Sequence, residues 1–253
     1  MKWKDKTVGL ALGGGGVRGF SHIGVLKILE QERIDVDVIV GTSAGALIGG
    51  AYACGQSPAE IQAKVEAYLR SPEFNASTLK SLGSAVSTQQ KGFLAKARNL
   101  LTSRYYLLRT FFSPSLLPSE DFSSMIHYFI PDLEIRQTRI PFRAVATDLI
   151  TGRKIVFSEG SLRTAVLASC AVPGAVEPVR QGQWLLADGG VTSLVPVHAT
   201  REAGADVVIA VTVDRELPPP EMETAQGIFY RAGEITASTL EDEELRDADV
   251  VIR

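Results

Sequence analysis

The sequence predicts an α/β protein in which a mostly parallel central sheet is covered by helices on both faces and a helical cap is inserted. Short apolar runs at Val8–Leu12 and Val36–Val40 are each followed by a glycine-containing turn and then by a helical pattern. Strands and helices that alternate in this way form parallel sheets with both faces covered. Strong strand patterns are missing between about residues 71 and 132, and this gap predicts the cap.

Composition indicates a single globular domain that covers residues 1–253. Of the 253 residues, 45% are hydrophobic and 22% are charged, which is ordinary for a globular protein. The formal net charge of -3 gives no electrostatic footprint for a nucleic-acid partner. Cys54 and Cys170 share no metal-ligand spacing, so we expect two reduced core thiols and no metal site.

The sequence favours a cytoplasmic protein. The apolar run behind the basic start ends after Leu12, which is too early for a signal peptide. No stretch approaches the roughly 18 consecutive apolar residues of a membrane-spanning helix. We expect any membrane contact to be peripheral. The strand-like ending at residues 250–253 leaves a C-terminal continuation open.

The first strand leads into a run of four glycines and then into a helix predicted at Phe20–Glu32. A glycine loop that enters a helix presents backbone N–H groups to an anion. We expect Gly14, Gly15 and Gly16 to form such a loop, with Arg18 bracing it or adding positive potential. The alternative is a glycine turn that serves only tight packing.

Residues 14–19 also match G-x-G-x-x-G, the fingerprint of dinucleotide-binding loops. That fingerprint needs an acidic residue near the end of the second strand, where it binds the ribose. Asp35 and Asp37 precede the strand segment Val38–Val40 instead of following it, and the lysine of a phosphate-binding P-loop is missing. Nucleotide binding is therefore an alternative and not the main interpretation.

Residues 41–45, Gly-Thr-Ser-Ala-Gly, match the nucleophile elbow G-x-S-x-G. The motif follows the second strand and precedes a helix predicted at Ala44–Ala53. In such a tight turn the hydroxyl of Ser43 is exposed, and the positive end of the helix favours an alkoxide or an oxyanion. Ser43 is therefore the candidate nucleophile; the alternative is a serine that only caps the helix.

The next helix is predicted to begin after Ser57, because Ser57-Pro-Ala-Glu60 is a capping box with proline at the first helical position. The predicted cap follows at about residues 71–132. Its segment 100–112 mixes leucines, aromatic residues and arginines. This composition is compatible with a lid that faces lipid and with a helix that packs on its own domain.

Later strands return after the cap, and one helix follows them at Pro196–Ala203 with Gly204 as its stop signal. The predicted strands are Phe142–Thr147, Lys154–Phe157, Trp184–Leu186 and Asp206–Val213.

The base that would activate Ser43 has few candidates, since the chain has three histidines. The order Ser43, Asp188, His198 fits an α/β-hydrolase triad. That fold usually places several strands before the nucleophile, whereas two precede it here, and His198 is typical of the first turn of a helix. His22 is more typical of a residue that braces the glycine loop, and His127 falls in the cap.

Asp188 is the favoured base. It follows a short apolar strand and precedes two glycines, and we expect it at the carboxyl end of a strand of the parallel sheet, where binding sites collect. Burial beside the elbow would raise the pKa of its carboxyl group and make it a better base. The alternative is a plain Asp-Gly turn. Asp148, in Asp-Leu-Ile-Thr-Gly, is interpreted as a structural turn residue.

Together these motifs resemble the patatin-like phospholipases, and their small bacterial branch in particular. The glycine loop 14–19, the elbow 41–45 and Asp188-Gly-Gly190 occur in the family's order. Residues 20–26, 146–149 with Gly152, and 168–174 are also similar to the family. The resemblance covers about residues 8–55 and 141–213.

The resemblance implies a three-layer α/β/α fold and hydrolysis of glycerolipid esters by a Ser–Asp dyad, without metal or cofactor. Ser43 would attack the ester carbonyl, and Asp188 would take its proton and later activate water. The N–H groups around Gly14, Gly15 and Gly16 would stabilise the oxyanion. A lipid or ester substrate is the expected partner, and the oligomeric state is open. The alternative is a regulatory protein that keeps the fold and acts by binding.

Overall fold

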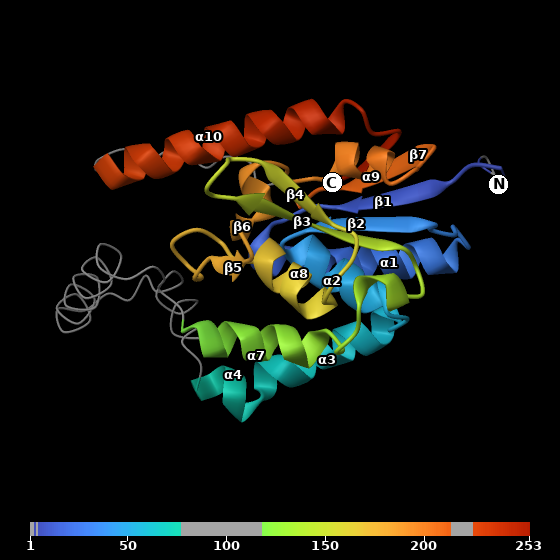
Figure 1. Cartoon of the computed structure of the whole chain (residues 1–253). Helices are drawn as coiled ribbons and strands as arrows, with labels where there is room; N and C mark the ends of the chain where they lie inside the picture. The colour runs from blue at the N-terminus through green and yellow to red at the C-terminus, as the bar shows by residue number, and fades with distance from the viewer. Residues whose placement is uncertain (1–2, 4, 77–117, 214–224) are drawn as a thin grey trace, which may run out of the picture.

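The central feature of the fold is one sheet, seen in a computed structural model that describes residues 3, 5–76, 118–213 and 225–253. Its strands are β1 (Val8–Leu12), β2 (Val38–Thr42), β3 (Phe142–Asp148), β4 (Lys154–Phe157), β5 (Val179–Gln181), β6 (Trp184–Asp188), β7 (Val207–Val211) and β8 (Val250–Ile252). Hydrogen bonds link them in the order β5-β6-β3-β2-β1-β7-β8, and β4 also pairs with β3 (Figure 1).

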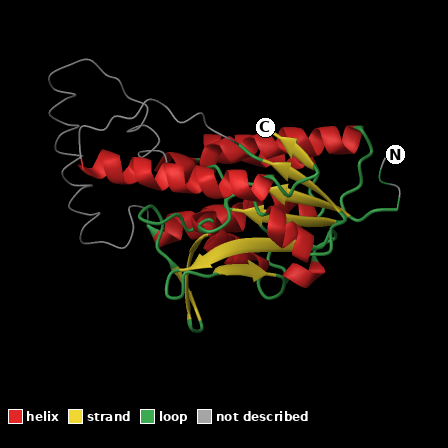
Figure 2. Ribbon diagram, turned by 90° about the horizontal axis from the view of Figure 1, so that it is seen from above, coloured by secondary structure: helices red, strands yellow, loops and turns green. Residues whose placement is uncertain are grey.

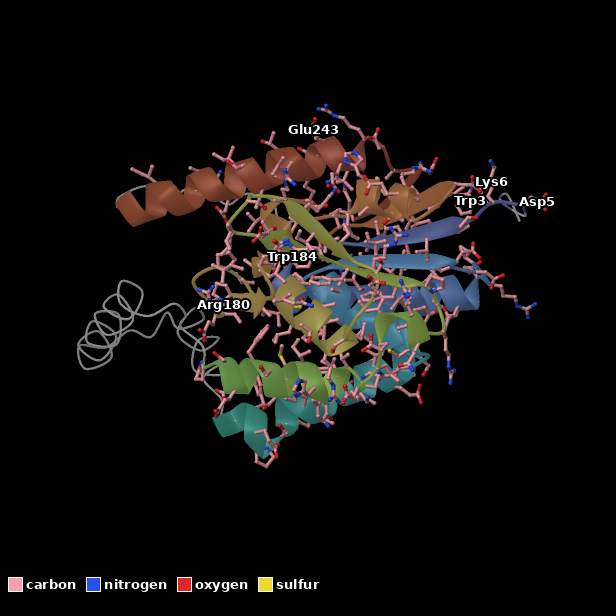
Figure 3. The ribbon with its side chains drawn as sticks, in the orientation of Figure 1. Trp3, Asp5, Lys6, Arg180, Trp184 and Glu243 are labelled. Carbon is pink, nitrogen blue, oxygen red and sulfur yellow. The ribbon has the colours of Figure 1, made fainter. Side chains whose placement is uncertain are left out.

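The sheet is parallel through β3, β2, β1, β7 and β8, as the alternation of strands and helices predicts. The remaining part is antiparallel, because β4 and β6 both run opposite to β3, and β5 runs opposite to β6. Arg180 and Trp184 mark the two strands of the β5–β6 hairpin (Figure 3). Trp184 packs edge-on against Phe157 of β4, with ring centroids 6.3 Å apart.

Helices cover both faces of the sheet. The described helices are α1 (His22–Gln31), α2 (Ala44–Ala53), α3 (Pro58–Arg70), α4 (Pro72–Ala76), α7 (Ser119–Phe129), α8 (Leu162–Ser169), α9 (Val197–Glu202) and α10 (Ala225–Leu245), with short 3-10 turns η1 (Gly16–Ser21), η2 (Ile135–Gln137) and η3 (Gly189–Val191). One face carries α9 and α10, and the other carries α1, α2 and α8, with α3, α4 and α7 outside them (Figure 1). Seen from above, the long α10 covers one end of the sheet and projects beyond it (Figure 2).

The structure confirms the predicted α/β class and several element boundaries. β1, β4 and α2 have the predicted bounds, and α3 begins with the predicted capping box. In that box the amide of Ser57 donates to the carboxylate of Glu60 at 2.7 Å. The helix predicted from Phe20 instead begins as η1 at Gly16 and becomes α-helical at His22.

The described end of the predicted cap belongs to the main domain. Phe122, Ile126 and Phe129 of α7 are buried in the principal core, against α2 and α8. Residues 77–117, including the segment 100–112, lie outside the described residues, so a lid and its contact with a membrane stay predictions. Within the described ranges, no helix is both long enough and apolar enough to cross a bilayer.

Candidate active site

Ser43 occupies the predicted turn between a strand and a helix. β2 ends at Thr42 and α2 begins at Ala44, and the backbone of Ser43 between them has φ 54° and ψ -122°. Holding the backbone of a non-glycine residue in such a sparsely populated conformation costs on the order of 1–3 kcal/mol of free energy. The surrounding structure must therefore hold Ser43 in place, which is the property expected of a nucleophile elbow.

The two glycines of the elbow are required by close approach of the backbone. A Cβ atom at Gly41 would lie 2.5 Å from the amide nitrogen of Ala46. At Gly45 it would lie 2.1 Å from the carbonyl oxygen of Leu12 in β1. Both distances are shorter than carbon and backbone atoms tolerate, so the turn can close in this form only with glycine at both positions.

Ser43 and Asp188 come together because two strands pair with neighbouring residues of β3. Val145 pairs with Thr42 of β2, and Ala146 pairs with Asp188 of β6. β4 occupies one edge of β3 at both residues, so β2 and β6 must follow one another along the other edge. The carboxyl ends of the two strands therefore meet. The prediction that Asp188 ends a parallel strand was wrong, since β6 runs antiparallel to β3 and reaches Ser43 from the opposite direction.

Burial sets the chemistry of Asp188. The residue is 6% exposed, and loss of water raises the pKa of its carboxyl group to about 6. The hydroxyl of Ser43 and the amide of Gly190 lower this pKa, but by less than burial raises it. The contact with Ser43 is looser than a standard hydrogen bond, because Oδ2 of Asp188 has no such bond to any described residue. Hydrogen bonds between catalytic groups are often loose before substrate binds.

The glycine loop lies directly against Ser43. A Cβ atom at Gly14 would be 3.2 Å from the Cβ atom of Ser43. The amide of Gly14 donates to the carbonyl oxygen of Leu194 at 2.9 Å, so it is already engaged. Gly15 and Gly16 stand at the N-terminal end of η1, where the first N–H groups of a helical turn have no partners within it. Of the three predicted oxyanion donors, the amides of Gly15 and Gly16 are thus the two without a backbone acceptor among the described residues.

His22 and Arg18 flank the glycine loop. Nε2 of the fully buried His22 lies 2.8 Å from the carbonyl oxygen of Gly13. A carbonyl oxygen only accepts hydrogen bonds, so Nε2 carries the proton, and burial lowers the pKa of the ring. His22 therefore braces the loop as a neutral group. Arg18 is an exposed residue of η1, and its backbone amide donates to the carbonyl oxygen of Gly15 at 3.3 Å, so its backbone belongs to the turn that closes the loop.

The other two histidines have different surroundings. His198 lies in the first turn of α9, as predicted, and its Nε2 lies within hydrogen-bond distance, 2.7 Å, of Oδ2 of Asp247 beyond α10. His127 is on the exposed side of α7. Neither has a recorded contact with Ser43 or Asp188. In the described part of the chain, no cluster of three His, Cys, Asp or Glu side chains could hold a metal ion.

Two further acidic residues have structural contacts. Asp148 accepts hydrogen bonds from Thr151 and from the amide of Leu185, and the bond from the Thr151 hydroxyl lowers the pKa of its carboxyl group. It shapes the β3–β4 turn, in agreement with its interpretation from sequence. Asp37 accepts from the amide of Val8 at 2.7 Å, at the amino ends of β1 and β2. That end is opposite to the glycine loop, which argues against the dinucleotide interpretation.

The C-terminal end of α8 is the part of the site that sequence analysis missed. Ser169 and Cys170 both contact the backbone of Ser43, although they are 126 and 127 residues away in the chain. Residues 168–174 resembled the family, but no physical role followed from their sequence. The sequence signal for this part of the site was the similarity of residues 168–174 to the family. Their contacts with Ser43 can be seen only in the folded structure.

Comparison with known proteins agrees with the fold and the motifs. The family model for patatin-like phospholipases matches residues 10–201. A protein of Mycobacterium tuberculosis named as an uncharacterized NTE family protein is 34% identical over 207 residues, which are 82% of this chain and 49% of that protein. The lysophospholipase nte1 of Emericella nidulans is 32% identical over 208 residues, or 82% of this chain and 12% of that protein.

Among solved structures, VipD from Legionella pneumophila matches with a TM-score of 0.45 and 14% identity, over 81% of this chain and 49% of that chain. The chain spans about half the length of the mycobacterial relative and a smaller part of the fungal one. The matched region contains the glycine loop, the elbow and Asp188. On the family match and the similarity to these relatives, the chain belongs to the patatin-like phospholipase family.

Proposed function

We propose that this protein is a serine hydrolase that cleaves carboxylic ester bonds of lipids, with Ser43 as nucleophile and Asp188 as general base. The observation that supports it most is the pairing of a strained serine with a buried carboxylate. Burial gives that carboxyl group a pKa of about 6, so near neutral pH it is ionised and still basic enough to take a proton.

In the acylation step, Asp188 removes the proton from Oγ of Ser43 while Oγ attacks the ester carbonyl carbon. The carbonyl electron pair moves onto its oxygen, and the resulting oxyanion accepts hydrogen bonds from the amides of Gly15 and Gly16. Such donors typically contribute a few kcal/mol each to transition-state stabilisation. When the tetrahedral intermediate collapses, the ester C–O bond breaks, the proton on Asp188 passes to the leaving alcohol, and an acyl-serine is left.

Deacylation repeats these steps with water as the nucleophile. Asp188 takes a proton from a water molecule while the water oxygen attacks the acyl-serine carbonyl carbon. The amides of Gly15 and Gly16 stabilise the second oxyanion. Collapse releases the fatty acid and returns the proton to Oγ of Ser43. Both serine and carboxylate are regenerated, so no metal or redox cofactor enters the balance.

Glycerolipid esters are the proposed substrate class. The family match and the naming of the fungal relative as a lysophospholipase support this class. A screen of phospholipids, lysophospholipids and acylglycerols, run with the wild type and with Ser43→Ala, would identify the ester that is cleaved.

Covalent labelling with a fluorophosphonate tests the nucleophile. We expect the wild type to be labelled, folded Ser43→Ala to be unlabelled, and Asp188→Asn to be labelled far more slowly. His198→Ala is the matched control and should label at the wild-type rate. If the wild type resists labelling even with detergent or lipid present, a regulatory protein that acts by binding becomes the better interpretation. Loss of turnover in His198→Ala alone would contradict the dyad.

A further inference from the structure

Three consecutive residues at the end of α8 contact both halves of the candidate dyad. The amide of Ser43 donates to Oγ of Ser169 at 2.9 Å, and the thiol of Cys170 donates to the carbonyl oxygen of Ser43 at 3.1 Å. The next residue, Ala171, accepts a 2.8 Å hydrogen bond from the amide of Asp188. One short segment thus fixes the backbone positions of the nucleophile and of the base.

The hydroxyl of Ser169 acts as donor and acceptor at once. It donates its single proton to the carbonyl oxygen of Val145 at 2.6 Å, so its oxygen is left to accept from the amide of Ser43. Val145 is the residue of β3 that pairs with Thr42, immediately before the one that pairs with Asp188. Ser169 therefore ties the elbow to the strand that also carries the base, and it is fully buried where it does so.

The elbow needs such a partner because of its conformation. β2 and its pairing with β3 end at Thr42, so the amide of Ser43 lies beyond the strand, while its carbonyl oxygen already accepts the first bond of α2 from Leu47 at 3.0 Å. A buried amide without a partner would favour a different turn. The bond to Ser169 also occupies the Ser43 amide, so this amide is not an oxyanion donor, and that task falls to the glycine loop.

We propose that Ser169 is a positioning residue for ester hydrolysis, which holds the strained backbone of Ser43 so that its hydroxyl points toward Asp188. Cys170 and Ala171 complete this clamp, which we define as residues 169–171. The inference rests on the proposed function, since it concerns the same site. Ser169 acts through the Ser43 amide and does not contact the reacting atoms.

The test compares substitutions at the two ends of α8. Ser169→Ala removes the acceptor for the Ser43 amide, and Ser161→Ala removes the N-cap of the same helix, where Ser161 accepts from Thr164 at 3.3 Å. On a soluble short-chain ester, we expect Ser169→Ala to lower kcat about 10- to 100-fold with KM changed less than about twofold, because small displacements of reacting groups are costly. Ser161→Ala should lower thermal stability and leave kcat unchanged. Ser169→Thr keeps the hydroxyl and should recover kcat.

A second measurement does not depend on activity. Hydrogen exchange of a peptide that covers residues 41–45 should be faster in Ser169→Ala than in the wild type, and unchanged in Ser161→Ala. If the wild type is neither active nor labelled, the proposed function fails, while the exchange experiment still decides whether the clamp exists.

Unchanged exchange together with a kcat within about twofold of the wild type in folded Ser169→Ala would overturn the proposal. So would a loss of kcat in Ser161→Ala as large as that in Ser169→Ala, because it would show a general effect of α8. If Ser169→Ala does not fold, Cys170→Ala removes only the thiol donor to Ser43. It should lower kcat in the same direction, and a folded Cys170→Ala with wild-type kcat would count against the clamp.

Discussion

Oδ1 of Asp188 accepts a 2.7 Å hydrogen bond from the amide of Gly190, and this bond orients the carboxylate so that Oδ2 has no partner of standard geometry among the described residues. In the proposed dyad, Oδ2 is therefore the atom that would take a proton from Ser43. Because burial raises the pKa of this carboxyl group to about 6, the proposed base would be lost to protonation below that pH.

We expect kcat/KM for a soluble ester to fall about tenfold for each pH unit below about 6, with a slope of one proton. The measurement is a pH profile of the wild type with a substrate that does not titrate in this range. Asp188→Asn should lower kcat/KM by about 10²- to 10⁴-fold and remove the acid limb. An acid limb near 4, the ordinary range of an aspartate, would contradict the assignment of Asp188 as the base.

The same pKa makes a prediction for stability. The folded chain holds the Asp188 proton up to about pH 6, whereas the unfolded chain loses it near 3.8, so stability falls as pH rises through this window. Asp188→Asn removes the buried charge, and should raise the free energy of unfolding by up to about 3 kcal/mol at pH 8. Urea denaturation at pH 8 and pH 5 checks this, because the gain should shrink at the lower pH.

Asp148→Asn is a control for Asp188→Asn, because the pKa of Asp148 is shifted in the opposite direction. Hydrogen bonds from Thr151 and Leu185 hold the pKa of Asp148 below its usual value, so its charge contributes to stability near neutral pH. That contribution is present above the unfolded pKa and is lost as pH falls through the folded one. Asp148→Asn should therefore destabilise at pH 8. If both substitutions shift stability in the same direction, the electrostatic explanation is wrong.

Two alanine substitutions of glycine should have opposite effects on stability. A Cβ atom at Gly45 would lie 2.1 Å from the carbonyl oxygen of Leu12, and neither backbone can move freely, so Gly45→Ala should destabilise by about 2–3 kcal/mol or more. Gly24 of α1 has open space around its Cα, so Gly24→Ala should stabilise by about 0.5–1 kcal/mol. Urea denaturation of both variants measures the difference, and a stable Gly45→Ala would show that the elbow is looser than the structure indicates.

His22 should make the protein sensitive to acid. Burial lowers the pKa of its ring below the unfolded value of 6.5, so the unfolded chain binds a proton before the folded chain does. Stability should therefore fall as pH drops below about 6.5 toward the folded pKa. The difference in unfolding free energy between the wild type and His22→Gln should change over this range. His127→Gln, the same substitution at an exposed site, is the control for the replacement of a histidine by glutamine.

The local parts of the site could be predicted because adjacent residues determine them. Gly41 and Gly45 specify a turn that only glycine can close, and the capping box at Ser57 sets where α3 begins. The glycine loop leads from β1 into a helical turn for the same reason. Each of these features depends on the backbone conformations that a few neighbouring residues allow.

The long-range parts could not be predicted from one sequence. The direction of β6 is decided by its pairing with β3, about 40 residues earlier, and an apolar strand of five residues does not reveal whether its partner runs parallel or antiparallel. The role of Ser169 depends on a contact with Ser43 that spans 126 residues. The helix α10 was not predicted at all, since its apolar positions follow the helical period only weakly.

The carboxyl ends of β2 and β6 lie next to one another along one edge of β3. This arrangement limits where proteins with this fold can gain or lose residues. Successive side chains of a strand point to opposite faces, so one inserted residue within β6 would turn the carboxylate of Asp188 away from Ser43. Insertions are tolerated best where they leave this pairing in register, as in the β5–β6 turn at Gly182. Designers who transplant loops onto this scaffold should therefore lengthen that turn and keep the spacing from Trp184 to Asp188 fixed.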